Sequence, residues 1–321
     1  MLGKVPPDAL RELVLSRTGA PDDRVLQGPA YGEDTAAVSL GEETLVVNTD
    51  PLSLAVERVG TLAVNVACND VAASGGVPAW LTCAVFLPGD ADPLDEITRQ
   101  LDETARELDV AIVGGHSEFL PALSTPLLVV TCLGLADRYV PTGGARPGDR
   151  LVLAGSAGIE ATAIIATDFR EQVAETVGAE TLAAGEACFD DVSVVLAGRT
   201  LAPYASAMHD PTEGGLVDGL FEMAAAAGVE LDVDRDAVPV RGATAKLCAA
   251  VGVDPLRTFG SGALVAAVPD EDTAAALSAL DEAGVEANVV GTVRAADSPR
   301  VRLDGETVTE PGRDQMYALW E

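Results

Sequence analysis

The chain has 321 residues, 48% of them hydrophobic, and its 51 acidic residues against 20 basic ones give a formal charge of −31. At roughly 150 residues per domain, this length predicts two domains with ample apolar material for a core. So acidic a chain lacks the basic patch that nucleic-acid binding requires, and no apolar run reaches the ~18 residues of a membrane helix, so we exclude both classes of protein.

Short β-rich runs alternate with amphipathic helical runs in the first half of the chain, a pattern typical of an α/β protein. The predicted strands cover residues 44–49, 80–86, 110–113 and 126–135, and the predicted helices cover residues 59–74 and 93–108. The second helix opens with Pro93, a residue type that suits the first turn.

A segment rich in glycine and proline, residues 141–149, interrupts this pattern. Such a segment indicates a domain boundary, so we predict one domain over residues 1–145 and a second over residues 146–321. The second half then has predicted strands over 150–154, 264–268 and 287–293, three helices between 158 and 198, and further helices over 214–227 and 271–283.

Two acidic residues lie at predicted turns. Asp34 belongs to the stretch Gly32-Glu33-Asp34, and Asp50 follows an apolar strand directly before Pro51. Acidic residues at the carboxyl ends of α/β strands occur at binding sites, but ordinary loops and turns use them as well. Each residue alone therefore leaves both interpretations open.

The pair Asn69-Asp70 gives a stronger signal, because it lies in the middle of a predicted helix. Leu62, Val66 and Ala73 form the apolar stripe of this helix, and the pair lies on or beside that stripe. An unpaired carboxylate on a buried face costs several kcal/mol. We therefore expect Asp70 to meet a cation, a metal or a hydrogen-bond network.

Two glycine-containing stretches complete the set of motifs. Residues 114–118 read Gly-Gly-His-Ser-Glu directly after a predicted strand. Paired glycines let a ligand approach the backbone, but they also suit a simple strand-to-turn junction. Asp210 and Thr212 precede the helix predicted over 214–227, where either residue could be an N-cap or belong to an anion site.

Dispersed carboxylates and glycine turns, without a CxxC motif or more than two histidines, favour Mg²⁺ over zinc. Mg²⁺ prefers oxygen ligands and commonly arrives bound to phosphates. A Walker-type phosphate loop is excluded, because neither lysine of the chain, Lys4 or Lys246, stands in the required GxxxxGK[ST] motif.

Charge and cysteine content predict where the protein works. An acidic, lysine-poor chain suits molar salt, where the screening length falls to about 3 Å and self-repulsion is suppressed, so we predict a halophilic protein. A surface that meets a cationic partner is the alternative, but the acidic residues are spread along the whole chain. Five separated cysteines in apolar stretches and an N-terminus without the apolar region of a signal peptide predict a cytoplasmic protein.

Taken in order, these motifs resemble those of the PurM-like (AIR synthase-related) superfamily, and most closely those of its HypE hydrogenase-maturation family. The resemblance extends over nearly the full chain. It is carried by GEDTAAV (32–38), TDPLS (49–53), LAVNVACNDVAASGGVP (62–78), GGHSE (114–118), HDPTEGGL (209–216) and FGSGALVAAVP (259–269).

The resemblance implies a two-domain α/β fold, with an N-terminal ATP-binding domain whose sheet forms a homodimer, and ATP held by Mg²⁺ in a cleft. It also implies roles for particular residues. These are metal–phosphate ligands (Asp34, Asp50, Asp70), nucleotide contacts (Thr49, Asn69, Gly114, Gly115) and a catalytic set (His116, Glu118, Asp210).

The sequence departs from the HypE pattern at two places. HypE proteins carry a reactive cysteine at the C-terminus, whereas this chain ends MYALWE and its last cysteine is Cys248; Glu213 stands where HypE has arginine. We therefore expect an enzyme that uses Mg-ATP to phosphorylate or activate an oxygen of a small-molecule or carbamoyl-type acceptor. A maturation factor that acts on the cysteine of a partner protein, and a non-catalytic nucleotide-binding scaffold, are the open alternatives.

Overall fold

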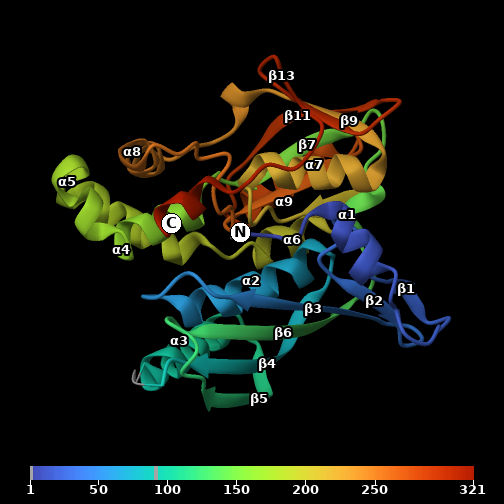
Figure 1. The fold of residues 1–321 in the computed structure, drawn as a ribbon. Coiled ribbons are helices and arrows are strands. Elements are labelled where there is room, and N and C mark those ends of the chain that lie inside the picture. Colours follow the sequence, from blue (N-terminus) through green and yellow to red (C-terminus); the bar gives the residue numbers. More distant parts are fainter. Residues whose placement is uncertain (1–2, 90–92) are drawn as a thin grey trace.

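The computed structural model describes residues 3–89 and 93–321, which form two mixed β-sheets with helices packed on them (Figure 1). The first sheet has the order β1-β2-β3-β6-β4-β5 and the second the order β13-β12-β9-β11-β7-β10-β8. The strands of the first sheet are β1 (Val25–Gln27), β2 (Ala36–Ser39), β3 (Thr44–Leu52), β4 (Val77–Leu87), β5 (Ala111–Phe119) and β6 (Leu127–Ala136). Those of the second are β7 (Arg150–Gly155), β8 (Ala207–His209), β9 (Val229–Val233), β10 (Ala263–Val268), β11 (Ala287–Ala295), β12 (Arg300–Leu303) and β13 (Glu306–Val308).

The predicted helices are all found, and two further α-helices, over residues 7–10 and 242–251, were not predicted. The α-helices are α1 (Pro7–Leu10), α2 (Val59–Ala73), α3 (Leu94–Glu107), α4 (Ile159–Thr167), α5 (Arg170–Glu186), α6 (Val195–Leu201), α7 (Gly215–Ala227), α8 (Gly242–Val251) and α9 (Thr273–Glu282). Short turns add η1 (Arg11–Leu15), η2 (Thr142–Gly144), η3 (Ala187–Asp191), η4 (Arg235–Ala237) and η5 (Gln315–Leu319). None of the helices in the described part of the chain has the length and hydropathy needed to cross a bilayer.

Two strands run further than the sequence predicts, and this changes the setting of two motifs. Strand β3 continues to Leu52, so Asp50 lies inside a strand rather than in a turn after it. Strand β5 includes the whole motif 114–118, because its parallel pairing with β4 continues as far as Leu87 and Phe119. Of the two interpretations of this motif, the simple strand-to-turn junction is therefore wrong. A Cβ on Gly115 would lie 2.0 Å from the carbonyl oxygen of Cys83, so the glycine permits close approach of the strands.

Helix α2 lies between the first sheet and the second domain (Figure 1). All 15 of its residues are buried, since its small and apolar side chains pack on the sheet on one side and on α6 on the other. A Cβ on Gly198 of α6 would come within 2.6 Å of the carbonyl oxygen of Ala72, so the two helices touch at backbone distance. The helix therefore joins the two domains through one core.

One face of the first sheet is covered by α2 and α3, and in the described chain the opposite face is open (Figure 1). Side chains alternate between the two faces of a strand. In β6, Leu128, Val130 and Cys132 are buried while their neighbours are only partly buried. Every residue of β5 is exposed, including Phe119 at 58%.

The N-terminal segment and the C-terminal turn η5 meet between the two domains. A Cβ on Gly3 would touch the ring of Tyr317 at 2.9 Å. Trp320 packs edge-to-face on Phe169 with ring centroids 4.9 Å apart, and Tyr317 packs in the same way on Phe259 at 5.7 Å. The end of the chain is thus packed into the protein beside the site described next.

Candidate functional site

Three aspartates from distant segments converge where the domains meet. Asp34 follows a turn at the start of the first domain, Asp70 lies on α2, and Asp210 directly follows β8 in the second domain. One carboxylate oxygen of each lies within 4.8 Å of those of the other two. Asp70 and Asp210 are 2% and 1% exposed, while Asp34 is accessible to solvent. The cluster therefore has two buried members and one that faces the solvent.

Asp50 joins this cluster through an asparagine. The side-chain amide of Asn48 donates to Asp50 at 2.9 Å and to Asp70 at 2.7 Å. Its carbonyl oxygen accepts from the backbone N–H of Cys132. Asn48 thus fixes the spacing of two like-charged carboxylates, and all four predicted aspartates lie in one region.

The two buried aspartates of the cluster, Asp70 and Asp210, form no ion pair with a basic side chain among the described residues. Burial, followed by the nearby Asp50 and Asp210, raises the pKa of Asp70 well above its ordinary value. Burial, followed by Asp34, raises the pKa of Asp210 to about 8. Both carboxylate oxygens of Asp210 are buried and have no hydrogen-bond partner within residues 3–89 and 93–321. A divalent cation would neutralise these groups and occupy their lone pairs, so the residues fit the Mg²⁺ that the family resemblance implies.

A chain of polar contacts that the sequence did not predict runs from Lys4 through Glu222 and His209 to Asp34 of the cluster. His209 lies between two carboxylates, with Nδ1 3.1 Å from Asp34 and Nε2 3.1 Å from Glu222. The ammonium group of Lys4 in turn lies 3.3 Å from Glu222. Although burial would lower the pKa of His209, these two carboxylates raise it well above its ordinary value. A charged imidazole therefore holds Asp34 in place.

Asn69 was predicted as a nucleotide contact, but its side-chain amide forms hydrogen bonds with the backbone of the second domain. Its amide nitrogen donates to the carbonyl oxygen of Val192 at 2.9 Å, and its carbonyl oxygen accepts from the N–H of Val194 at 2.8 Å. Both contacts cross from α2 to the second domain. They position α2, and with it Asp70, relative to that domain.

The remaining predicted residues lie elsewhere. His116 and Glu118 pair with each other at 2.8 Å on the edge strand β5, which also contains Gly114 and Gly115. Thr49 is exposed on β3, where its hydroxyl contacts that of Thr131 at 2.8 Å. None of these five residues lines the cavity at the aspartates. Within one chain, the structure does not bring them together with the cluster.

A cavity of about 600 Å³ opens at the cluster, within the ~300–1,000 Å³ range of small-molecule sites. Both domains line it. Its described wall contains the carboxylates Asp34, Asp50, Asp70, Glu160 and Glu213 and one basic side chain, Lys4. An anionic phosphate chain can approach such a wall only together with cations.

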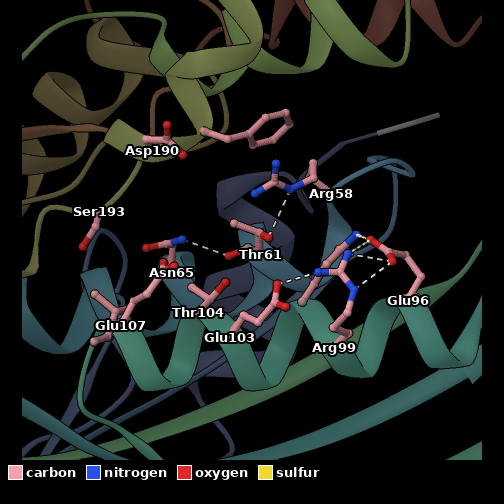
Figure 2. Close-up of a pocket in the computed structure, with 13 residues that line it drawn as sticks. Arg58, Thr61, Asn65, Glu96, Arg99, Glu103, Thr104, Glu107, Asp190 and Ser193 are labelled. Carbon is pink, nitrogen blue, oxygen red and sulfur yellow. Dashed lines mark hydrogen bonds and ion pairs between the residues drawn. The ribbon is translucent and has the colours of Figure 1, made fainter.

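A second cavity of about 550 Å³ lies between α3 and η3 (Figure 2). Arg58, Glu96, Arg99 and Glu103, four of its charged side chains, already have partners within the protein. Arg99 pairs with Glu96 and Glu103 at 2.6 Å each, and the Asn65 side chain donates to the carbonyl oxygen of Thr61. The cavity at the aspartates, where buried polar atoms lack partners, is therefore the better candidate.

This fold and site define a two-domain α/β protein with an acidic cavity between its domains. Two family models match the chain: the N-terminal domain of AIR synthase related protein over residues 32–136 and the C-terminal domain of that family over residues 146–304. The chain is 32% identical to the carbamoyl dehydratase HypE of Cupriavidus necator, over 82% of this chain and 77% of the relative. It is 33% identical to the thiamine-monophosphate kinase of Halobacterium salinarum, over 88% of this chain and 93% of the relative.

A solved structure of the hydrogenase maturation protein HypE in complex with ATP matches with a TM-score of 0.73 and 25% identity, covering 95% of this chain and 93% of that one. The chain therefore belongs to the AIR synthase-related family, the PurM-like superfamily, and is similar to HypE within it. The two-domain PurM-like fold expected from the motifs is confirmed.

Proposed function

We propose that the protein is an enzyme that binds Mg-ATP in the cavity between its domains and uses it to activate an oxygen of an acceptor molecule. The observation that carries this proposal is the convergence of Asp34, Asp70 and Asp210, with the buried Asp210 oxygens unpartnered among the described residues. Relatives named carbamoyl dehydratase and thiamine-monophosphate kinase, and a HypE structure with ATP, support the same class of reaction.

In this proposal, Asp34, Asp50 and Asp70 hold Mg²⁺ and the nucleotide phosphates, and Asp210 completes the site on the acceptor side. Bound ATP would supply the phosphoryl group, and Mg²⁺ would neutralise the charge that develops on the phosphoryl oxygens. His209 holds Asp34, Asn48 holds Asp50 and Asp70, and burial shields Asp70 and Asp210 from bulk water. The acceptor oxygen takes up the phosphoryl group and ADP is released.

We also propose that the protein forms a homodimer through the open face of its first sheet. The exposed ring of Trp80 and the partly buried Leu133 beside it on this face support the proposal, since monomers rarely expose large apolar patches. The predicted roles of Thr49, Gly114, Gly115, His116 and Glu118 depend on this assembly, because these residues lie on the exposed strands rather than at the aspartates.

Binding of Mg-ATP tests the proposed function. In molar KCl, Mg-ATP at about 100 times its dissociation constant should stabilise the protein by roughly 2.7 kcal/mol. ATP with excess EDTA should give no stabilisation, because the carboxylates of the cavity repel the triphosphate. Denaturant titrations measure both. Equal stabilisation with and without divalent cations would contradict the proposal. A scaffold would bind Mg-ATP but release no ADP with any acceptor in a metabolite screen.

An alternative is a maturation factor that acts on the cysteine of a partner protein. All five cysteines of this chain are buried, which favours the thiol of a partner protein as the acceptor. They are Cys68, Cys83, Cys132, Cys188 and Cys248. Incubation with ATP and a carbamoyl donor should therefore leave no carbamoyl or cyano group on this chain, as read by intact-mass spectrometry. Unfolded protein treated with iodoacetamide is the control for thiol reactivity. A stable adduct on any cysteine of the folded protein would show that the chain carries its own acceptor.

A further inference from the structure

The wall of the cavity on the side of the second domain contains polar groups that the aspartate cluster does not use. They come from four segments: Glu160 in the first turn of α4, Glu213 before α7, Ser261 before β10 and Tyr317 in η5. The ring of Phe259 lines the same wall and packs edge-to-face on Tyr317. These residues adjoin the proposed phosphate site but lie apart from its aspartates in the sequence.

Two hydroxyl groups on this wall are buried without a partner. Ser261 is 0% exposed and Tyr317 is 3% exposed, yet neither hydroxyl has a hydrogen-bond partner in the part of the chain that the structure describes. The same holds for one carboxylate oxygen of Glu213. A buried polar group left unpaired costs about 1–3 kcal/mol, so several together indicate the place of a ligand.

The charge of the wall indicates which ligand it accepts. Glu160 accepts a hydrogen bond from the N–H of Ser261 at 3.2 Å, whereas one carboxylate oxygen of Glu213 has no partner among the described residues. The nearest ammonium on the wall, that of Lys4, pairs with Glu222. An anionic group of a ligand would therefore meet carboxylates and no free cation among the described residues. A cationic nitrogen would meet the Glu213 carboxylate, hydroxyl oxygens and the ring of Phe259, and aromatic rings favour cations at their faces. The ring of Tyr317 already has such a partner, because the guanidinium of Arg313 lies 5.5 Å from its centroid.

We propose that Glu213, Tyr317, Ser261 and Phe259 form the subsite that binds the acceptor, and that they select an acceptor with a positively charged nitrogen group such as an amidinium, guanidinium or ammonium. This rests on the proposed function, because it assigns the acceptor of that reaction. An adjoining cavity of about 880 Å³ shares Glu213 and Tyr317 and is lined by apolar residues that include Leu10 and Leu15. It has room for an apolar body attached to the cationic head.

Three probes of one shape but different charge test the subsite: benzamidine (cation), benzamide (neutral) and benzoate (anion). Titrated into the Mg-ATP-loaded protein in molar KCl, benzamidine should bind most tightly, at least about tenfold more tightly than benzoate. In Glu213→Gln this ratio should fall about tenfold, because the carboxylate that prefers a cation is gone. In Tyr317→Phe, which keeps the ring, benzamidine should bind a few-fold more weakly. The exposed Glu180→Gln on α5 is the matched control and should retain the wild-type ratio.

The outcomes separate this inference from the proposed function. Benzoate binding as tightly as benzamidine, or no binding of any probe, would overturn the subsite. If Glu213→Gln and the wild type prefer benzamidine equally, the preference comes from the overall negative charge of the protein. This result would also overturn the subsite. A third outcome would reject the proposed function but support the subsite. In that outcome, the wild-type protein gains no stability from Mg-ATP, yet without the nucleotide it binds benzamidine more tightly than benzoate, and Glu213→Gln loses this preference.

Discussion

Replacing Asp70 with asparagine is expected to abolish stabilisation by Mg-ATP and to leave the unliganded protein at least as stable as the wild type. Asp70 is buried beside Asp50 and Asp210, and none of its contacts within the described residues is an ion pair with a basic side chain. Removing its charge therefore relieves repulsion, while the asparagine oxygen can still accept from Asn48. The roughly 2.7 kcal/mol of stabilisation at about 100 times the dissociation constant should vanish.

Paired denaturant titrations with and without Mg-ATP measure both effects. The exposed Asp190→Asn on η3 is the matched control, and it should retain the full effect of Mg-ATP. Had Asp70 been the partner of a buried arginine, its loss would cost roughly 3–5 kcal/mol. A variant that unfolds readily but still gains full stability from Mg-ATP would therefore show that Asp70 serves the fold and not the metal.

Transfer to low salt is expected to unfold the protein. Even if every basic residue paired with one carboxylate, 51 acidic and 20 basic residues would leave 31 carboxylates unpaired. At about 1 M salt the screening length is roughly 3 Å, and it grows to more than 10 Å at about 50 mM. Repulsion across the whole molecule then outweighs a net stability of about 5–15 kcal/mol.

Circular dichroism across a KCl series measures this loss, and NaCl at equal ionic strength should give the same curve if screening is the cause. A far-UV spectrum that is unchanged at about 50 mM salt would reject salt adaptation. A curve that depends strongly on the identity of the cation would point to bound ions instead of screening.

Much of the fold could be predicted from local patterns. Helix α2 was predicted over 59–74 and spans Val59–Ala73, and α7 was predicted over 214–227 and spans Gly215–Ala227. The ends of β3 and β5 could not be predicted, since proline and glycine normally interrupt strands. Pairing with neighbours distant in the sequence extends both strands through these residues.

The site could be predicted only in part. Asp34, Asp50, Asp70 and Asp210 were identified from their motifs, and the structure brings them together. The contact of Lys4 with Glu222 spans 218 residues, and no local pattern could reveal it. One signal was available: Glu222 is an acidic residue within the apolar helix α7, the same type of feature that drew attention to Asp70.

The two hydrogen bonds of Asn69 were unpredictable for the same reason, because their partners lie 123 and 125 residues further along the chain. An asparagine beside an aspartate that is predicted to bind a metal suits a ligand contact and a structural link equally well. Only the positions of Val192 and Val194 distinguish the two roles.

Asn69 and Asp70 are neighbours on one turn of α2, yet one fastens the second domain and the other belongs to the acidic cluster. A small rotation of this helix would move both residues at once, so at the proposed Mg-ATP site the affinity for nucleotide would depend on the contact between the domains. Substitutions at that contact, for example where Gly198 meets Ala72, would then change the proposed activity without touching any reacting group. Positions that lie far from the cavity, at the contact between the domains, could therefore affect the proposed activity as much as positions that line it.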